Sequence, residues 1–167
     1  MILIINLVKD IMKGYLNLGT IMKTKIKNIK ALIRLKINPA NPKLNIVLNE
    51  LEEVLSSYKI NPMKKANILK IMHLLRSLES TLKLFLQENG IPFSGHSSMG
   101  KFFHIYNEHS YTTIGNIDSS ELNRYIKNLS DYRNQFMHNA GEYPRNERVI
   151  NNLLDEVEIC LIRILNL

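Results

Sequence analysis

Residues 132–138, Tyr-Arg-Asn-Gln-Phe-Met-His, hold the side chains best suited to chemistry. On a helix, Asn134 and His138 share one face, and Arg133 lies about 100° from Asn134 around the axis. A guanidinium holds phosphate oxygens and stabilises developing negative charge, while an imidazole exchanges protons near neutral pH. RNA supplies its own nucleophile, the 2′-OH. The pattern therefore suits cleavage of a phosphodiester without a metal ion.

A purely structural interpretation of the same residues also stands. Arg133 could make a local ion pair, and His138 would sit near the C-terminal end of a helix, where cations are favoured. The spacing by itself does not choose between this interpretation and catalysis.

Other catalytic or metal sites find little support in the sequence. There is no glycine-rich phosphate loop and no G-x-S-x-G motif. No two of the five histidines are three or four positions apart, so no metal and no cofactor is expected. Cys160 is the single cysteine, which excludes an internal disulfide and a multi-cysteine zinc site. We expect a buried, inert thiol and an intracellular, cytoplasmic protein.

Helical periodicity over most of the chain predicts an all-α fold, a bundle of four core helices. One helix is expected to have Asn41 as its N-cap and Pro42 as its first residue. A long helix of about 27 residues runs from Asn61-Pro62 to Asn89-Gly90. A short helix is expected over 98–109 and a loop over 110–117. Asp118-Ser-Ser-Glu121 resembles a capping box and opens the helix that carries Arg133. The last helix follows Tyr143-Pro144.

Positive charge is concentrated at the start of the chain. The net charge is +7, and the first 38 residues carry the whole excess, because the remainder holds equal numbers of acidic and basic residues. We therefore expect one domain, the bundle over 41–167, preceded by a basic helical arm over 1–40 that Gly14 and Gly19 break. A basic stripe at helical spacing predicts an RNA-binding face, with a merely solvated face as the alternative; it comprises Lys23, Lys27, Lys30 and Arg34. The apolar opening MILIINLV is too short to span a membrane, and no membrane partner is expected.

The bundle and its Arg-to-His motif resemble the HEPN domain superfamily over roughly residues 44–166. The string Leu-Ser-Asp-Tyr-Arg-Asn-Gln-Phe-Met-His, 129–138, is similar to HEPN toxins that pair with minimal nucleotidyltransferase antitoxins. The preceding long helix, with Glu79-Ser-Thr-Leu-Lys83, is also similar to that helix in many members.

This resemblance implies a metal-independent endoribonuclease, a toxin or anti-phage defence effector. Arg133 and His138 would be catalytic, Asn134 would support them, and Glu79 would orient one of them. The implied partners are an RNA substrate, a second copy in a homodimer, and an antitoxin or larger defence complex. In the toxin subgroup a Tyr two residues past the His receives a nucleotidyl mark. Ala140 occupies that position here, so the resemblance provides no acceptor there.

Two other functions remain open on the sequence. One is a non-catalytic HEPN module that dimerises or binds a partner, in which case Arg133 and His138 would be sealed in a closed network. The other is a basic nucleic-acid-binding protein whose function lies in residues 20–37.

Overall fold

Helices connected by short irregular segments make up the residues that the computed structural model describes, which are 2–109, 118–138, 141–144 and 146–165. Side chains are described from residue 19 onward, that of His138 excepted. The elements are α1 (Ile2–Lys36), α2 (Leu44–Ser56), the 3₁₀ turn η1 (Ser57–Lys59), α3 (Met63–Glu88), α4 (Met99–His109), α5 (Ser119–Tyr125), the π-helical segment η3 (Ile126–Ser130), α6 (Asp131–His138) and α7 (Glu147–Leu165). No strand occurs in these ranges, which confirms the all-α prediction.

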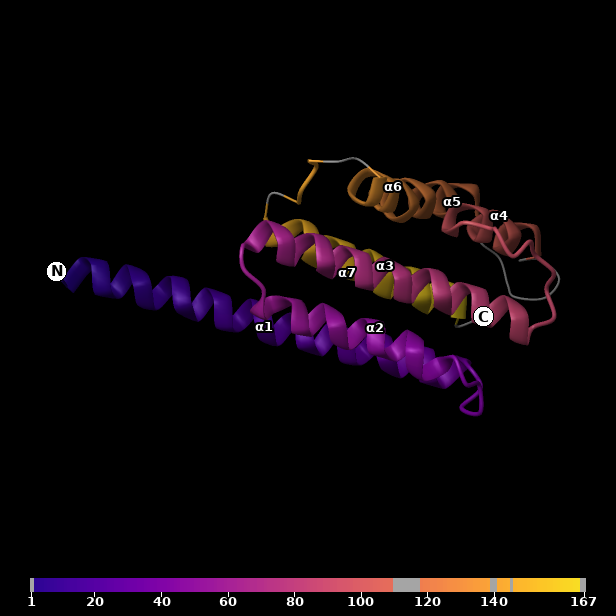
Figure 1. The fold of residues 1–167 in the computed structure, drawn as a ribbon, viewed down its shortest axis with the longest axis horizontal. Coiled ribbons are helices and arrows are strands. Elements are labelled where there is room, and N and C mark those ends of the chain that lie inside the picture. The colour runs from indigo at the N-terminus through magenta and orange to yellow at the C-terminus, as the bar shows by residue number, and fades with distance from the viewer. Residues whose placement is uncertain (1, 110–117, 139–140, 145, 166–167) are drawn as a thin grey trace.

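The helices form three layers (Figure 1). The long helix α3 and the last helix α7 contact each other in the middle layer. On one side α2 packs on α3 and α1 packs on α7. On the other side α6 contacts α3, and α4 contacts α3, α5 and η3. The middle layer therefore separates the basic segment of α1 from α6, which carries Arg133.

The first helix is continuous, so the expected breaks at Gly14 and Gly19 are wrong. A glycine inside a helix costs about 1 kcal/mol relative to alanine, but it keeps its backbone N–H and removes no helical hydrogen bond. The apolar stripe of α1 is buried and belongs to the core shared with the other helices; it comprises Met22, Ile26, Ile29, Ile33 and Ile37. The part of the chain expected to be an arm thus supplies core residues, while the N-terminal turns of α1 extend past the bundle (Figure 1).

Both ends of α3 follow the sequence signals. The helix begins directly after Pro62 and ends before Gly90, whose φ of 67° is the left-handed conformation that glycine adopts without strain. Glu88, at its last turn, accepts hydrogen bonds from the backbone N–H of Asn38 (2.9 Å) and from Asn41 Nδ2 (2.8 Å). The last turn of α3 therefore holds the connector between α1 and α2.

The start of α2 differs from the expectation by one short turn. Its N-cap is Lys43, not Asn41. Asn41 instead caps the turn before the helix, because its Oδ1 accepts from the backbone N–H of Lys43 at 3.0 Å.

The helix that leads to Arg133 begins at the predicted cap. Asp118 accepts hydrogen bonds from the backbone N–H groups of Ser120 (2.8 Å) and Glu121 (2.9 Å). The Ser120 hydroxyl also donates to it, and these bonds lower the pKa of the Asp118 carboxyl. After α5 the chain passes through η3 before α6. A π-helical turn is wider than an α-helical one, so it rotates the residues of α6 around the helix axis relative to those of α5.

Ser130, the last residue of η3, is buried beside α4. A Cβ on Gly100 of α4 would lie 3.0 Å from Ser130 Oγ, tighter than normal packing. Glycine at this position therefore lets α4 contact η3.

A charged group lies inside the bundle at Lys70. Its side chain is only 1% exposed, and its Nζ lies 3.0 Å from Glu147 Oε1 at the start of α7. The same ammonium sits over the Tyr58 ring, 3.5 Å from the centroid, and Asn67 Oδ1 is at 3.5 Å. This cluster joins η1, α3 and α7 through one buried cation.

Cys160 is buried as expected, and burial raises the pKa of its thiol well above the usual value. We expect the native protein to react with a disulfide reagent at mildly alkaline pH at least about 100-fold more slowly than the urea-unfolded chain. In the folded protein the Cys160 thiol stays protonated and the reagent cannot reach it. The rate of thiol labelling, followed by absorbance, measures this. Equal rates in the two states would contradict the burial.

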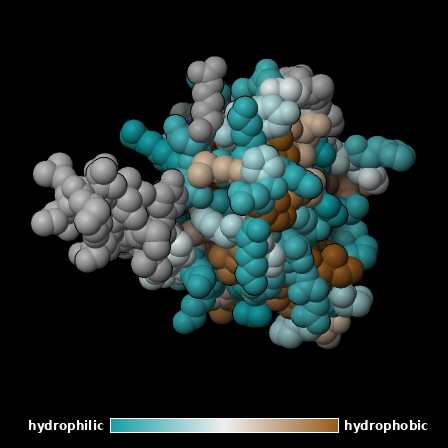
Figure 2. Space-filling model, turned by 60° about the vertical axis from the view of Figure 1, so that its left-hand side comes forward, coloured by the Kyte–Doolittle hydropathy of each residue, from teal (hydrophilic) through white to brown (hydrophobic). Residues whose placement is uncertain are grey.

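The surface is mainly hydrophilic on the face drawn in Figure 2, with separate apolar patches. Within the described ranges, no helix is long and apolar enough to cross a membrane.

Candidate functional site

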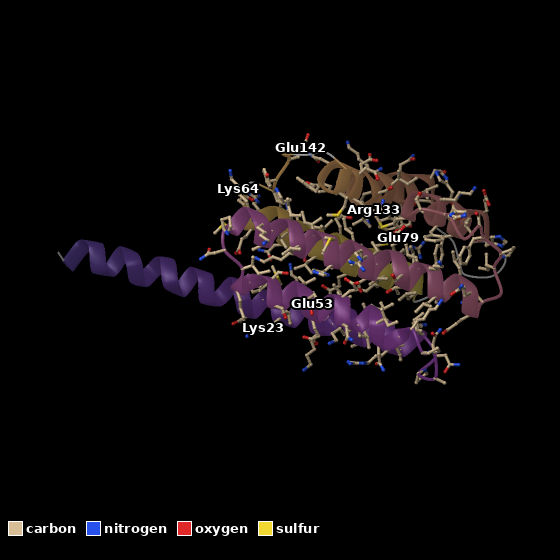
Figure 3. The ribbon with its side chains drawn as sticks, viewed as in Figure 1. Lys23, Glu53, Lys64, Glu79, Arg133 and Glu142 are labelled. Carbon is tan, nitrogen blue, oxygen red and sulfur yellow. The ribbon has the colours of Figure 1, made fainter. Side chains whose placement is uncertain are left out.

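Arg133 lies on the first turn of α6 and faces α3. Its Nε is 3.2 Å from Oε2 of Glu79, and the two side chains are 29% and 21% exposed. Figure 3 shows the pair between the two helices. The structure thus brings together the predicted Arg133 and its predicted supporting carboxylate.

The Arg133 side chain lines a groove of about 500 Å³. Its walls come from α2, α3, α4, α6 and the loop between α3 and α4; the lining residues are Ile46, Val47, Glu50, Arg76, Glu79, Ser80, Lys83, Gly95, Ser97, Phe102 and Arg133. Arg133 is therefore reachable from solvent and is not sealed in a closed network.

A second ion-pair cluster borders the same groove. Glu50 of α2 accepts at Oε1 from Arg76 Nη2 at 3.0 Å, and its Oε2 is 2.7 Å from His73 Nδ1. The carboxylate is 15% exposed, whereas Arg76 is 57% exposed. Glu50 thus anchors one guanidinium at the groove in the same way as Glu79 anchors the other.

This cluster is not among the sequence-predicted site residues. The sequence did contain an indication of this polar face, because the long helix carries polar residues on one side of its axis, at positions 73, 76, 80 and 83. The carboxylate partner comes from α2, however, and no sequence spacing links Glu50 to His73.

Of the two other members of the motif, Asn134 and His138, the structure describes only the side chain of Asn134. Asn134 is exposed on α6. His138 is the last residue of α6, and its side chain lies outside the described part of the structure. Five residues of ideal α-helix rotate a position by about 140°, so positions 133 and 138 lie on different sides of α6. In agreement, Gln135 lines a different cavity of about 520 Å³, together with Glu142 and Tyr143.

The predicted basic stripe of α1 lies in another layer. In Figure 3, Lys23 lies below the middle layer and Arg133 above it. Lys23, Lys27 and Arg34 are exposed, but Lys30 forms an ion pair with Glu52 of α2. Ala140, at the position of the toxin subgroup's modified Tyr, is outside the described residues.

Comparisons of the chain with models of known protein families, with curated proteins and with solved structures find no match. In the part of the chain that the structure describes, no three His, Cys, Asp or Glu side chains gather in a way that could hold a metal ion.

Proposed function

We propose that this protein is a metal-independent endoribonuclease of HEPN type, acting as a toxin or defence effector. His138 moves the proton between the 2′-OH nucleophile and the 5′-oxygen leaving group. Arg133 stabilises the negative charge that develops on the phosphorus oxygens. The single observation that supports this most is Arg133, held by Glu79 at the edge of a solvent-reachable groove.

The anchoring by Glu79 suits this role physically. The closest contact of the Arg133–Glu79 ion pair is made by Nε. A guanidinium also carries two terminal nitrogens, and it binds a phosphate through two parallel N–H donors. A side chain already fixed by a carboxylate loses less conformational freedom when the substrate binds.

The rotation between positions 133 and 138 favours a site completed by a second copy of the chain. In a two-fold dimer, the same surface of each protomer faces the other. His138 of one protomer can then approach Arg133 of its partner across the interface, as the HEPN resemblance implies.

Product chemistry tests the reaction. We expect purified wild-type protein to cut single-stranded RNA into fragments with a 2′,3′-cyclic phosphate and a 5′-OH, at a rate unchanged by EDTA. Fragment ends are identified by phosphatase and kinase treatment and by mass spectrometry. RNA methylated at each 2′-OH is the matched control and should stay intact, because it lacks the nucleophile. Fragments with a 5′-phosphate, or loss of cutting in EDTA, would contradict the mechanism.

A non-catalytic dimerising or partner-binding module is the second candidate. The Arg133–Glu79 ion pair favours this second candidate, because a partly buried guanidinium whose charge is compensated by a carboxylate can also serve a purely structural role. In that case wild-type protein cuts no RNA, and Arg133→Ala lowers only the stability of the fold.

A further inference from the structure

The groove beside Arg133 is lined by two further cationic side chains that have no role in the proposed catalysis. Arg76 and Lys83 line it together with Arg133, against the two carboxylates of Glu50 and Glu79. Both carboxylates are engaged by guanidiniums. Across the described residues, no carboxylate lies within ion-pair distance of Lys83, whose Nζ is 6.0 Å from the Phe93 ring centroid.

We propose that this groove binds the backbone phosphates of single-stranded RNA next to the cleaved bond, with Arg76 and Lys83 as the binding residues. The proposal rests on the proposed function, because Arg133 at the scissile phosphate sets where the strand enters. It replaces the α1 stripe as the main RNA contact, since α1 lies beyond the α3–α7 layer.

The arrangement of the cations fits a strand better than one small anion. Arg76 and Lys83 are seven residues apart on α3, which is about 10 Å along the helix. Arg133 approaches from the opposite wall, on α6. Cations spread over this length contact successive phosphates, whereas a single phosphate needs them at one point.

The rest of the lining supports the same ligand. Ser80 and Ser97 place hydroxyl groups in the groove, and Gly95 leaves the loop backbone uncovered by a side chain. Ile46 is 63% exposed at its rim and offers an apolar contact to an unstacked base. A volume of about 500 Å³ with an open side accommodates a short length of a single strand.

Binding to RNA that cannot be cut tests the groove separately from catalysis. The probe is a fluorescent single-stranded oligoribonucleotide methylated at each 2′-OH, titrated with the full chain and followed by anisotropy at several salt concentrations. For Arg76→Gln/Lys83→Gln we expect Kd to rise about tenfold or more. The slope of log Kd against log salt should fall by about 1.4, because each lost phosphate contact removes about 0.7.

The matched control removes the same charge from α1. Lys23→Gln/Lys27→Gln, both exposed, should change Kd less than about threefold, the general effect of net charge alone. Lys83→Gln by itself breaks no ion pair with a described residue, so it tests the groove even if the double variant unfolds. It should lower the slope by about 0.7.

The outcomes separate the two proposals. If wild-type protein cuts no RNA but the groove variants weaken binding as expected, the catalytic proposal fails and the groove stands. If wild-type protein cuts RNA and the groove variants bind and cut equally well, the groove proposal fails. It also fails if inorganic phosphate or a mononucleotide occupies the groove at micromolar concentration and RNA does not compete, which would assign a small-anion site.

Discussion

Replacing His138 by Ala is expected to lower the rate of RNA cleavage by on the order of 10²–10⁴-fold, because the proton exchanged with the 2′-OH or the leaving oxygen loses its carrier. Arg133→Ala should lower kcat by on the order of 10²–10³-fold, since one donor to the developing phosphate charge is removed. Single-turnover cleavage of a defined RNA measures both. Gln135→Ala, exposed on the same helix, is the control and should cut at the wild-type rate.

Mixing the two inactive variants tests whether the site is shared between protomers. If Arg133 of one protomer acts with His138 of its partner, a mixed dimer keeps one intact site, so random pairing restores about a quarter of the activity. No recovery after mixing, with exchange of protomers verified, means that both residues act within one chain. Full activity of His138→Ala would refute the catalytic role.

Replacing Glu147 by Gln is expected to lower the free energy of unfolding by about 3–5 kcal/mol, because the buried Lys70 ammonium loses its counter-charge. Lys70 is 1% exposed, and its ion pair with Glu147 links α3 to α7. The Tyr58 ring still contacts the cation, but a cation–π contact compensates only part of an ion pair. Urea unfolding followed by circular dichroism measures the change.

Two further variants isolate the charge effect. Glu52→Gln breaks the ion pair with Lys30 on the surface, where Glu52 is 54% exposed, and should cost less than about 1 kcal/mol. Lys70→Met/Glu147→Leu removes both charges of the pair and should recover most of the stability lost in Glu147→Gln, because apolar side chains of similar size pack without the cost of desolvating a charge. If the double variant is less stable than Glu147→Gln, the packing of the Lys70 and Glu147 side chains stabilises the fold, and the pairing of their charges does not.

Local signals in the sequence were enough for most of the secondary structure. The extent of α3 follows from Pro62, its apolar spacing and Gly90, and the start of α5 follows from Asp118. These signals act within one turn of the chain, so no tertiary information is needed. The continuous α1 was missed because a glycine lowers helix propensity only modestly, and neighbouring residues decide whether the helix continues.

For the candidate site, too, the sequence predicted individual residues, and the tertiary structure decided which of them are in contact. Residue types and spacing alone predicted the Arg133-to-His138 motif, and the family resemblance added Glu79 as a supporting residue. Only the tertiary structure decided that Glu79 contacts Arg133, that Glu50 of α2 holds Arg76 at the same groove, and that the basic stripe of α1 lies in another layer. Contacts between helices depend on which faces meet, and a π-helical segment such as η3 alters that facing without any clear mark in the sequence. Periodicity defines the faces of each helix, but packing decides which of them meet.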